Sequence, residues 1–326
     1  MKDAPLLEVE GLCKSYPAGR RGGFGRPTMQ VLTDVGLTIA PGEVLGLVGE
    51  SGSGKSTLGK AVLRLTDSQS RSLRFAGRDL AGLTGPQLRA MRKEMQIIFQ
   101  DPYASLDPRK TIRAVLSEAL DAHHLHVGAG REGRLAELMG MVGLSAEFLD
   151  RRPHEFSGGQ RQRVGIARAL AVEPRFIVAD EAVSALDVSI QAQVLNLMAD
   201  LRQKTGVSLL FISHDLSVVR FISDRIMVLY LGRVMEVGPA DAVHFAPAHP
   251  YTAALVSAEP SLRRTSGRIR LTGEIPSPLA PPSGCVFRSR CPYALPACGE
   301  KVPQLRAIGA GRFKACIRDD ILQGDQ

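Results

Sequence analysis

Tryptophan is absent from this chain of 326 residues, and all aromatic residues together make up 5% of it. Long apolar runs are absent as well. Runs such as residues 44–48, 176–179 and 209–212 fall far short of the roughly 20 residues that a membrane-spanning helix needs. The first five residues contain no apolar signal core, so we expect the protein to stay in the cytosol. If it works at a membrane, another chain must hold it there.

The composition is otherwise ordinary for a globular protein, with 44% hydrophobic and 23% charged residues, which excludes the disordered and fibrous classes. The formal charge is +8 and the pI is near 9.5. Such a charge permits contact with nucleic acid or with an anionic membrane surface. Basic runs interleaved with aromatic residues are lacking, however, and an Arg-rich solvated surface is the simpler interpretation. We therefore expect no nucleic-acid partner.

Four of the five cysteines lie near the end of the chain: Cys285, Cys291, Cys298 and Cys316. In a cytosolic protein such a group indicates metal or redox chemistry before structural disulfides. Four thiolates suit an iron–sulfur cluster or a tetrahedral zinc ion, and four free, partly buried thiols are the alternative. The lack of a C-x2-C pair disfavours a ribbon-type zinc site. Cys13 stands alone, and we expect it in the core of the first strand.

Apolar patterns predict an α/β protein in which a helical block interrupts a buried parallel sheet. We expect a main domain over residues 1–258, with the helical block at about 101–170, and a proline-rich linker with the four-cysteine extension over 259–326. Strands are expected at residues 6–16, 31–39, 43–48, 175–179, 207–213 and 226–231, and helices at 55–65, 112–122, 131–142, 160–171 and 189–204.

A glycine-rich turn joins the strand at 43–48 to the helix at 55–65 and fits the phosphate-binding pattern G-x-x-x-x-G-K-S. Its glycines let backbone N–H groups turn toward phosphate oxygens, and the helix N-terminus adds positive potential. Lys55 supplies a positive charge for the β- and γ-phosphates, and the Ser56 hydroxyl is placed to coordinate Mg²⁺. The residues expected to contact a nucleotide here are Gly49, Ser51, Gly52, Ser53, Gly54, Lys55, Ser56 and Thr57.

Two adjacent carboxylates end the buried strand at 175–179. Asp180 would hold Mg²⁺, directly or through water, and Glu181 would orient the attacking water and accept its proton. Adjacent acids at a strand end are often merely solvated, so this interpretation depends on the phosphate loop upstream. Together the two motifs predict hydrolysis of ATP, with Lys55 and Glu181 as catalytic residues.

A second glycine-containing helix start follows the helical block. Ser157 is a good N-cap, and the glycines that follow leave backbone N–H groups open for an anion. A chain that already has a phosphate loop has no evident need for a second anion site, unless that site meets the ATP of another subunit. The segment is Ser157, Gly158, Gly159 and Gln160.

This segment resembles the signature motif of ABC ATPases, with Phe156 where Leu is commoner. The resemblance covers roughly residues 6–258 and implies a P-loop NTPase fold of the ABC type. Further matches come in the family's order. Tyr16 matches the aromatic residue that stacks on adenine, and Gln100 matches the glutamine that contacts Mg²⁺ and the transport partner. His214 matches the switch histidine that reaches the γ-phosphate, and Asp187 ends a segment that resembles the loop crossing the dimer interface.

Narrower features resemble one branch, the motor subunits of dipeptide and oligopeptide importers. Residues 99–109 look like the entry to their helical subdomain, and residues 249–252 followed by the proline-rich linker look like their C-terminal region. Some members of that branch hold an iron–sulfur cluster in a similar cysteine-rich extension. The branch implies a peripheral position at the cytoplasmic face of the membrane, a heterodimer with a related ATPase, two permeases and an extracytoplasmic binding protein.

The resemblance leaves alternatives open. Relatives of this branch carry peptides, nickel chelates, glutathione or opines, and the sequence does not reveal which. A soluble ABC ATPase that acts on nucleic acid or ribosomes is the main alternative, but no long coiled-coil insertion or second cassette is visible. A regulatory subunit without activity is disfavoured because Lys55, Asp180, Glu181 and His214 are all present.

Overall fold

The computed structural model describes residues 4–17, 28–101, 105–126, 128, 130–259, 269 and 271–320. Contacts divide the chain into two compact units. Among the described residues, unit 1 consists of 40–43 and 82–212, and unit 2 consists of 4–39, 44–81 and 213–320. Three residues of the importer-like segment at 99–109, namely 102–104, lie outside the described residues.

Unit 1 is built on three parallel strands in the order β8-β7-β6: β6 (Met95–Ile98), β7 (Phe176–Asp180) and β8 (Ser208–Ile212). Every residue of β7 and β8 is buried, as continuous apolar runs in a parallel sheet require. The connection between them is the helix α7 (Val188–Thr205), which Asp187 caps at its start and Gly206 ends at a φ of 68°. Only a residue that tolerates the left-handed conformation ends a helix in this way.

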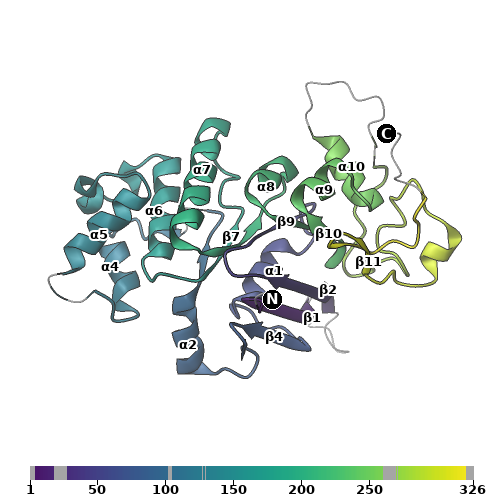
Figure 1. The fold of residues 1–326 in the computed structure, drawn as a ribbon, viewed down its shortest axis with the longest axis horizontal. Helices are drawn as coiled ribbons and strands as arrows, with labels where there is room; N and C mark the ends of the chain where they lie inside the picture. Colours follow the sequence, from purple (N-terminus) through teal and green to yellow (C-terminus); the bar gives the residue numbers. More distant parts are fainter. Residues whose placement is uncertain are drawn as a thin grey trace. The chain divides into compact units, whose positions relative to one another are not determined.

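The chain between β6 and β7 is mainly helical, as the sequence predicts. Its helices α4, α5 and α6 contact one another (Figure 1). The helix α2 precedes β6, and its N-cap Thr84 forms a capping box with Gln87. The bounds are α2 (Gly85–Glu94), α4 (Ile112–Asp121), α5 (Gly130–Met141), η1 (Ala146–Asp150), η2 (Pro153–Glu155) and α6 (Gly158–Leu170).

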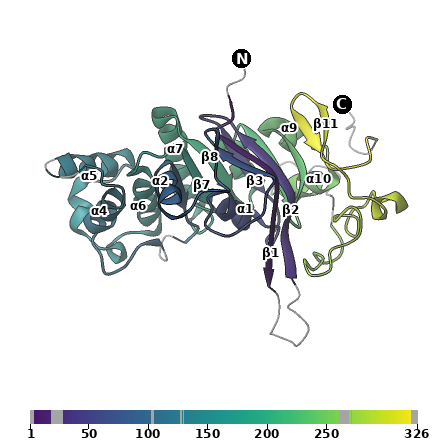
Figure 2. The same ribbon diagram turned by 90° about the horizontal axis from the view of Figure 1, so that it is seen from below.

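Unit 2 contains an antiparallel sheet in the order β2-β1-β4-β5. Its two long strands, β1 and β2, lie side by side in Figure 2. Its longest pair, β1 with β2, runs from Leu7 opposite Ile39 to Pro17 opposite Thr28, with register shifts that mark bulges. Leu7, Leu12, Leu32 and Ile39 are completely buried. The bounds are β1 (Leu7–Pro17), β2 (Thr28–Ile39), β4 (Ser72–Phe75) and β5 (Arg78–Asp79).

A second run of strands in unit 2 has the order β11-β12-β10-β9-β3. The strand β3 pairs in parallel with β9, whereas the other pairs are antiparallel. The strand β3 is buried throughout and leads through the glycine-rich turn into α1. The bounds are β3 (Val44–Val48), α1 (Lys55–Val62), α8 (Leu216–Ile222), β9 (Arg225–Tyr230), β10 (Arg233–Pro239), α9 (Ala240–Phe245), α10 (Pro250–Ala258), η3 (Pro296–Gly299), β11 (Arg306–Gly309) and β12 (Arg312–Lys314).

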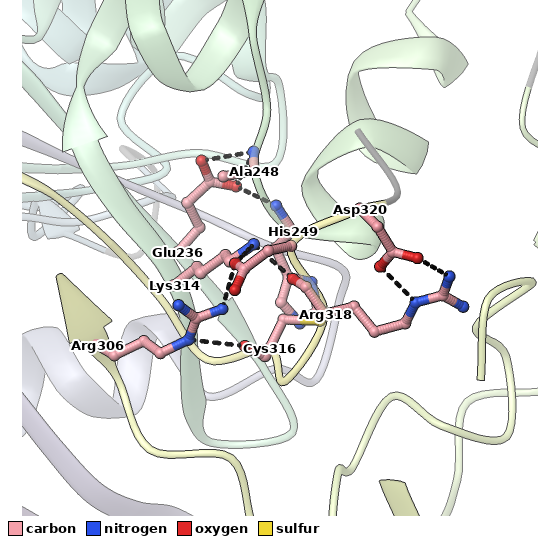
Figure 3. A network of polar contacts seen from close by, with 9 residues as sticks. Glu236, Ala248, His249, Arg306, Lys314, Cys316, Arg318 and Asp320 are labelled. Atoms are coloured by element: carbon pink, nitrogen blue, oxygen red, sulfur yellow. Dashed lines mark hydrogen bonds and ion pairs between the residues drawn. The ribbon is translucent and has the colours of Figure 1, made fainter. Parts of the chain in front are cut away.

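The C-terminal extension of unit 2 is attached to β10 through its hairpin β11–β12, around a fully buried carboxylate, Glu236 (Figure 3). The backbone N–H groups of Ala248 and His249 donate to Glu236, and Arg312 donates to it at 3.1 Å. Burial lowers the pKa of His249 to about 3, so its ring is neutral and accepts from the Tyr251 N–H. The three donors to Glu236 offset the cost of burying its carboxylate, which is otherwise large.

The predicted fold class is confirmed: the chain is α/β, and the strand–turn–helix at β3–α1 has the P-loop arrangement. Within the described residues, no helix is both long and apolar enough to cross a bilayer. The sequence patterns did not predict β4, β5, β6, β10, α2, α8, α9, α10 or the β11–β12 hairpin, and residues 259–326 were expected as a proline-rich linker and a four-cysteine extension.

Candidate functional site

The glycine-rich turn between β3 and α1 leaves the start of α1 open for an anion. Gly54 is the N-cap of α1, and no side chain caps the helix there. Its φ of 103° and its closeness to β2 require glycine, because a Cβ would lie 2.9 Å from the Val31 carbonyl oxygen. The first N–H groups of a helix have no partner within it, and they attract negative charge.

Lys55 is 4% exposed at the base of this turn. Its Nζ donates to the carbonyl oxygens of Gly49 at 2.7 Å and Glu50 at 3.2 Å, so the ammonium group is held inside the loop. The buried Ser53 hydroxyl has no hydrogen-bond partner among the described residues. Ser51 and Gly52 are exposed, and Ser56 and Thr57 are half-buried in the first turn of α1. A buried cation and an unpaired buried hydroxyl fit a phosphate group.

Two carboxylates end β7 in unit 1, as the sequence predicts. Asp180 is 5% exposed, and Glu181 follows at a φ of 47°, in the left-handed region. A residue with a Cβ held there is strained, and such strain is typical of functional sites. The Glu181 N–H donates to the Ile212 carbonyl oxygen, and Ser184 donates to the Glu181 carbonyl oxygen from both its backbone and its hydroxyl. Glu181 is therefore fixed in position.

The structure brings Gln100 and Glu181 together: Nε2 of Gln100 donates to Oε2 of Glu181 at 3.0 Å. Gln100 is exposed and lies two residues after β6, and Glu181 comes directly after the neighbouring strand β7. Parallel strands end at the same edge of a sheet, which is why residues 81 positions apart meet. Buried Asp180 directly precedes Glu181 in sequence. Carboxylate and amide oxygens are ligands that suit Mg²⁺.

The predicted second anion site is a capped helix start. Ser157 accepts from the Gln160 N–H at 3.3 Å, and the Gln160 side chain accepts from the Ser157 N–H at 3.0 Å. This capping box leaves the N–H groups of Gly158 and Gly159 at the open end of α6. Gly159 also touches α7, because a Cβ there would lie 2.3 Å from Cγ2 of Ile190.

The remaining predicted residues have other neighbours. The half-buried Tyr16 ring in β1 has the Lys14 ammonium 4.5 Å from its centroid. Asp187 caps α7 by accepting from the Ile190 N–H at 3.0 Å. His214 is exposed just before α8. Tyr16, the phosphate loop and His214 belong to unit 2, and the other predicted ATP-site residues belong to unit 1.

Burial raises the pKa of the Cys291 thiol to about 11. Cys285, Cys316 and Cys298 add smaller contributions in the same direction, so the four cysteines of the extension lie close enough for their charges to interact. Across the described ranges, which include all four thiols, no three His, Cys, Asp or Glu side chains form a group that could hold a metal ion. The structure thus gives the expected iron–sulfur cluster no support.

Glu50, the second position of the phosphate loop, is held by residues that were not predicted from the sequence. The Glu50 carboxylate accepts from both terminal nitrogens of Arg290, at 2.6 and 3.0 Å, and the Glu50 N–H donates to the Tyr251 hydroxyl at 2.9 Å. Both partners lie about 200 residues or more further along the chain. No local pattern links positions so far apart. The sequence shows only that Glu50 lies within the phosphate-loop pattern and that Arg290 directly precedes Cys291.

Comparison with known proteins identifies two family models in the chain. One, described as ABC transporter, matches residues 32–184 and so includes the phosphate loop, the signature segment and both carboxylates. The other, described as oligopeptide/dipeptide transporter, C-terminal region, matches residues 235–298.

Similar proteins extend over nearly the full chain. A putative peptide import ATP-binding protein of Brucella ovis is 53% identical over 98% of this chain and 100% of its own length. The oligopeptide transport ATP-binding protein AppF of Bacillus subtilis is 47% identical over 95% of this chain and 96% of its own length. Among solved structures, one is the ATP-binding cassette MJ0796, a dimer in a post-hydrolysis state bound to ADP and Pi. It is 28% identical to this chain with a TM-score of 0.63, and the match covers 72% of this chain and 98% of that one. CbiO1 of Clostridium perfringens shares the fold, with a TM-score of 0.63 at 24% identity over 73% of this chain and 90% of its own.

The relatives cover almost the whole chain, and both family models agree with them. The chain is therefore an ATPase that belongs to the dipeptide and oligopeptide importer family of ABC transporter ATP-binding proteins.

Proposed function

We propose that this chain hydrolyses ATP to power the import of peptides, as a peripheral subunit on the cytoplasmic face of the cytoplasmic membrane. The observation that carries the proposal is the presence of two helix starts suited to anions, the phosphate loop before α1 and the Ser157-capped start of α6. One bound ATP needs only one phosphate loop in its own chain. The second helix start is explained if it faces an ATP held by another subunit. The relatives named for peptide import support the choice of solute.

Binding of the nucleotide is assigned to the residues that the sequence predicts. The loop N–H groups and Lys55 would hold the β- and γ-phosphates, because the buried ammonium is already directed into the loop. Tyr16 would stack on the adenine. Ser56, Gln100 and Asp180 would hold Mg²⁺, which neutralises charge on the phosphate oxygens when it is bound.

Hydrolysis is assigned to Glu181, which orients the attacking water and accepts its proton. The Gln100 amide donates to one oxygen of this carboxylate. The backbone hydrogen bonds of Glu181 fix the residue in place and so set the direction of the other oxygen. His214 would contact the γ-phosphate. Both residues act on a group that the Lys55 loop has positioned, so their effects depend on a bound nucleotide.

Coupling to transport requires a partner. We propose a heterodimer with a related ATPase, in which each ATP contacts the phosphate loop of one subunit and the Ser157–Gln160 segment of the other, with Asp187 near the shared boundary. ATP must bind the closed pair much more tightly than the open pair to drive closure. Closure would move two permeases, and an extracytoplasmic binding protein would deliver the peptide. The ATPase domain would cover residues 1–258, with its helical subdomain at about 101–170, and the extension 259–326.

Two variants of the assembled complex test this proposal. Lys55→Ala should abolish ATP binding and uptake of a labelled dipeptide, because the loop loses its only buried cation among the described residues. Glu181→Gln should retain ATP binding and slow turnover by about a hundredfold or more. Normal uptake with Lys55→Ala, in a complex shown to contain all its subunits, would refute the assignment. Co-purification with nucleic acid in place of permeases would favour the soluble class.

A further inference from the structure

The phosphate loop is tied to the C-terminal extension through a single residue, Glu50. Its carboxylate forms a two-pronged ion pair with Arg290, 240 positions away, at 2.6 and 3.0 Å. The Arg290 side chain is 8% exposed and that of Glu50 is 24% exposed. Planar, paired contacts of this kind are the strongest charge-assisted hydrogen bonds in proteins, and their geometry is specific.

Aromatic side chains fix Arg290 in place. Phe287, three residues before it and fully buried, packs against two tyrosines, with its ring centroid 5.4 Å from that of Tyr230 and 5.3 Å from that of Tyr251. Arg290 also donates to the Tyr230 hydroxyl at 3.3 Å. The Tyr251 hydroxyl accepts the Glu50 N–H. The extension therefore holds the Glu50 side chain directly, through Arg290. It also supports the Glu50 backbone indirectly, because Phe287 packs against Tyr251, whose hydroxyl accepts the Glu50 N–H.

The charge of Glu50 is unfavourable for the loop in which it lies. The loop must attract a nucleotide with several negative charges, and a carboxylate within it repels them. Arg290 neutralises that carboxylate, and the pairing also raises the pKa of Arg290 further above its usual range. The Glu50 carbonyl oxygen accepts from Lys55, so a displaced Glu50 would move the ammonium that is assigned to the phosphates.

We propose that Arg290 is a positioning residue for ATP: it neutralises Glu50 and fixes the phosphate loop in its binding conformation. The extension thereby contributes to nucleotide affinity, although it lies outside the matched ATPase family model. This inference rests on the proposed assignment of residues 49–57 as the phosphate loop.

The test measures ATP affinity and turnover in the full-length protein within its complex, using Mg-ATP. Arg290→Met should raise KM for ATP about tenfold with little change in kcat, in line with couplings between contacting residues. Glu50→Gln removes the repulsion, so the double variant Glu50→Gln with Arg290→Met should recover most of the lost affinity. Arg290→Lys, which keeps the charge, should fall between wild type and Arg290→Met.

The matched control is Arg288→Met. Arg288 lies in the same segment, but its guanidinium donates to Ser283 within the extension, at 2.8 and 3.2 Å. Its KM should equal that of the wild type. An unchanged KM in Arg290→Met, or a double variant that is worse than Arg290→Met, would overturn the inference. If Lys55→Ala still binds ATP normally, the loop assignment itself fails; loss of binding in Lys55→Ala with a normal Arg290→Met refutes only the role of Arg290.

Discussion

The side-chain amide of Gln100 donates a hydrogen bond to the carboxylate of Glu181, with 3.0 Å between the two atoms. This bond joins the residue expected to sense the transport partner to the residue assigned to proton transfer. A shift of Gln100 therefore changes the direction of the Glu181 carboxylate. Because both residues belong to unit 1 and follow neighbouring strands, the link is short and direct.

Replacing Gln100 with Ala should lower kcat roughly tenfold, the size typical for a residue that orients a catalytic group. KM for ATP should change less, because Gln100 is one of several proposed contacts to the nucleotide and Mg²⁺. The measurement is steady-state ATP hydrolysis by the assembled complex. In the background of Glu181→Gln, the same Gln100→Ala change should have little further effect. Independent, multiplied losses in the double variant would contradict the coupling.

Gly159→Ala should impair the signature segment, because the new Cβ would lie 2.3 Å from Cγ2 of Ile190. We expect a loss of about 1–3 kcal/mol in the free energy of unfolding, as for other overpacked sites, together with reduced ATP hydrolysis. Denaturant titration and an ATPase assay measure the two effects.

The control for this change lies on the same helix. A Cβ at Gly165 meets no atom within 4 Å, so Gly165→Ala should keep stability or raise it by up to about 1 kcal/mol through helix propensity. Equal losses from both substitutions would show that the contact with Ile190 is not the cause.

The Cys291 thiol should react slowly with iodoacetamide at pH 8. Burial raises its pKa from 9.0 to about 11, so the thiolate fraction at pH 8 is about a hundredfold lower than for an unshifted thiol. Since the folded form favours the protonated thiol, protection should persist through pH 9 and disappear as the pH approaches 11. Mass spectrometry of timed alkylation measures this. A rate independent of pH, together with bound iron and sulfide or zinc, would show thiolates held by a metal.

Local patterns were sufficient for the elements that carry the chemistry. The apolar run of β3, its glycine-rich turn and the following helix are adjacent in sequence, so their periodicity and spacing predict them together. The same holds for β7 with Asp180 and for Ser157 with α6. What sequence did not reveal depends on tertiary pairing. The strands β11 and β12 are only four and three residues long and partly exposed, so they have no apolar alternation.

Buried charges were the other feature beyond reach. Glu236 is completely buried because the N–H groups of Ala248 and His249 and the side chain of Arg312 donate to it. Arg290 is buried because Glu50 neutralises it. A charged residue in sequence is expected at the surface unless its partner is known. The spacing of residues in the sequence identifies neither the donors to Glu236 nor the partner of Arg290.

Crosslinking across the two ATPase subunits addresses the shared ATP site most directly. A photoreactive amino acid at His154, an exposed residue three positions before Ser157, would be introduced into the complex carrying Glu181→Gln to trap ATP. We predict an ATP-dependent crosslink from His154 to the phosphate-loop peptide of the partner ATPase, absent when ADP replaces ATP. Crosslinks confined to the chain's own residues, with ATP bound, would contradict an ATP held between two subunits.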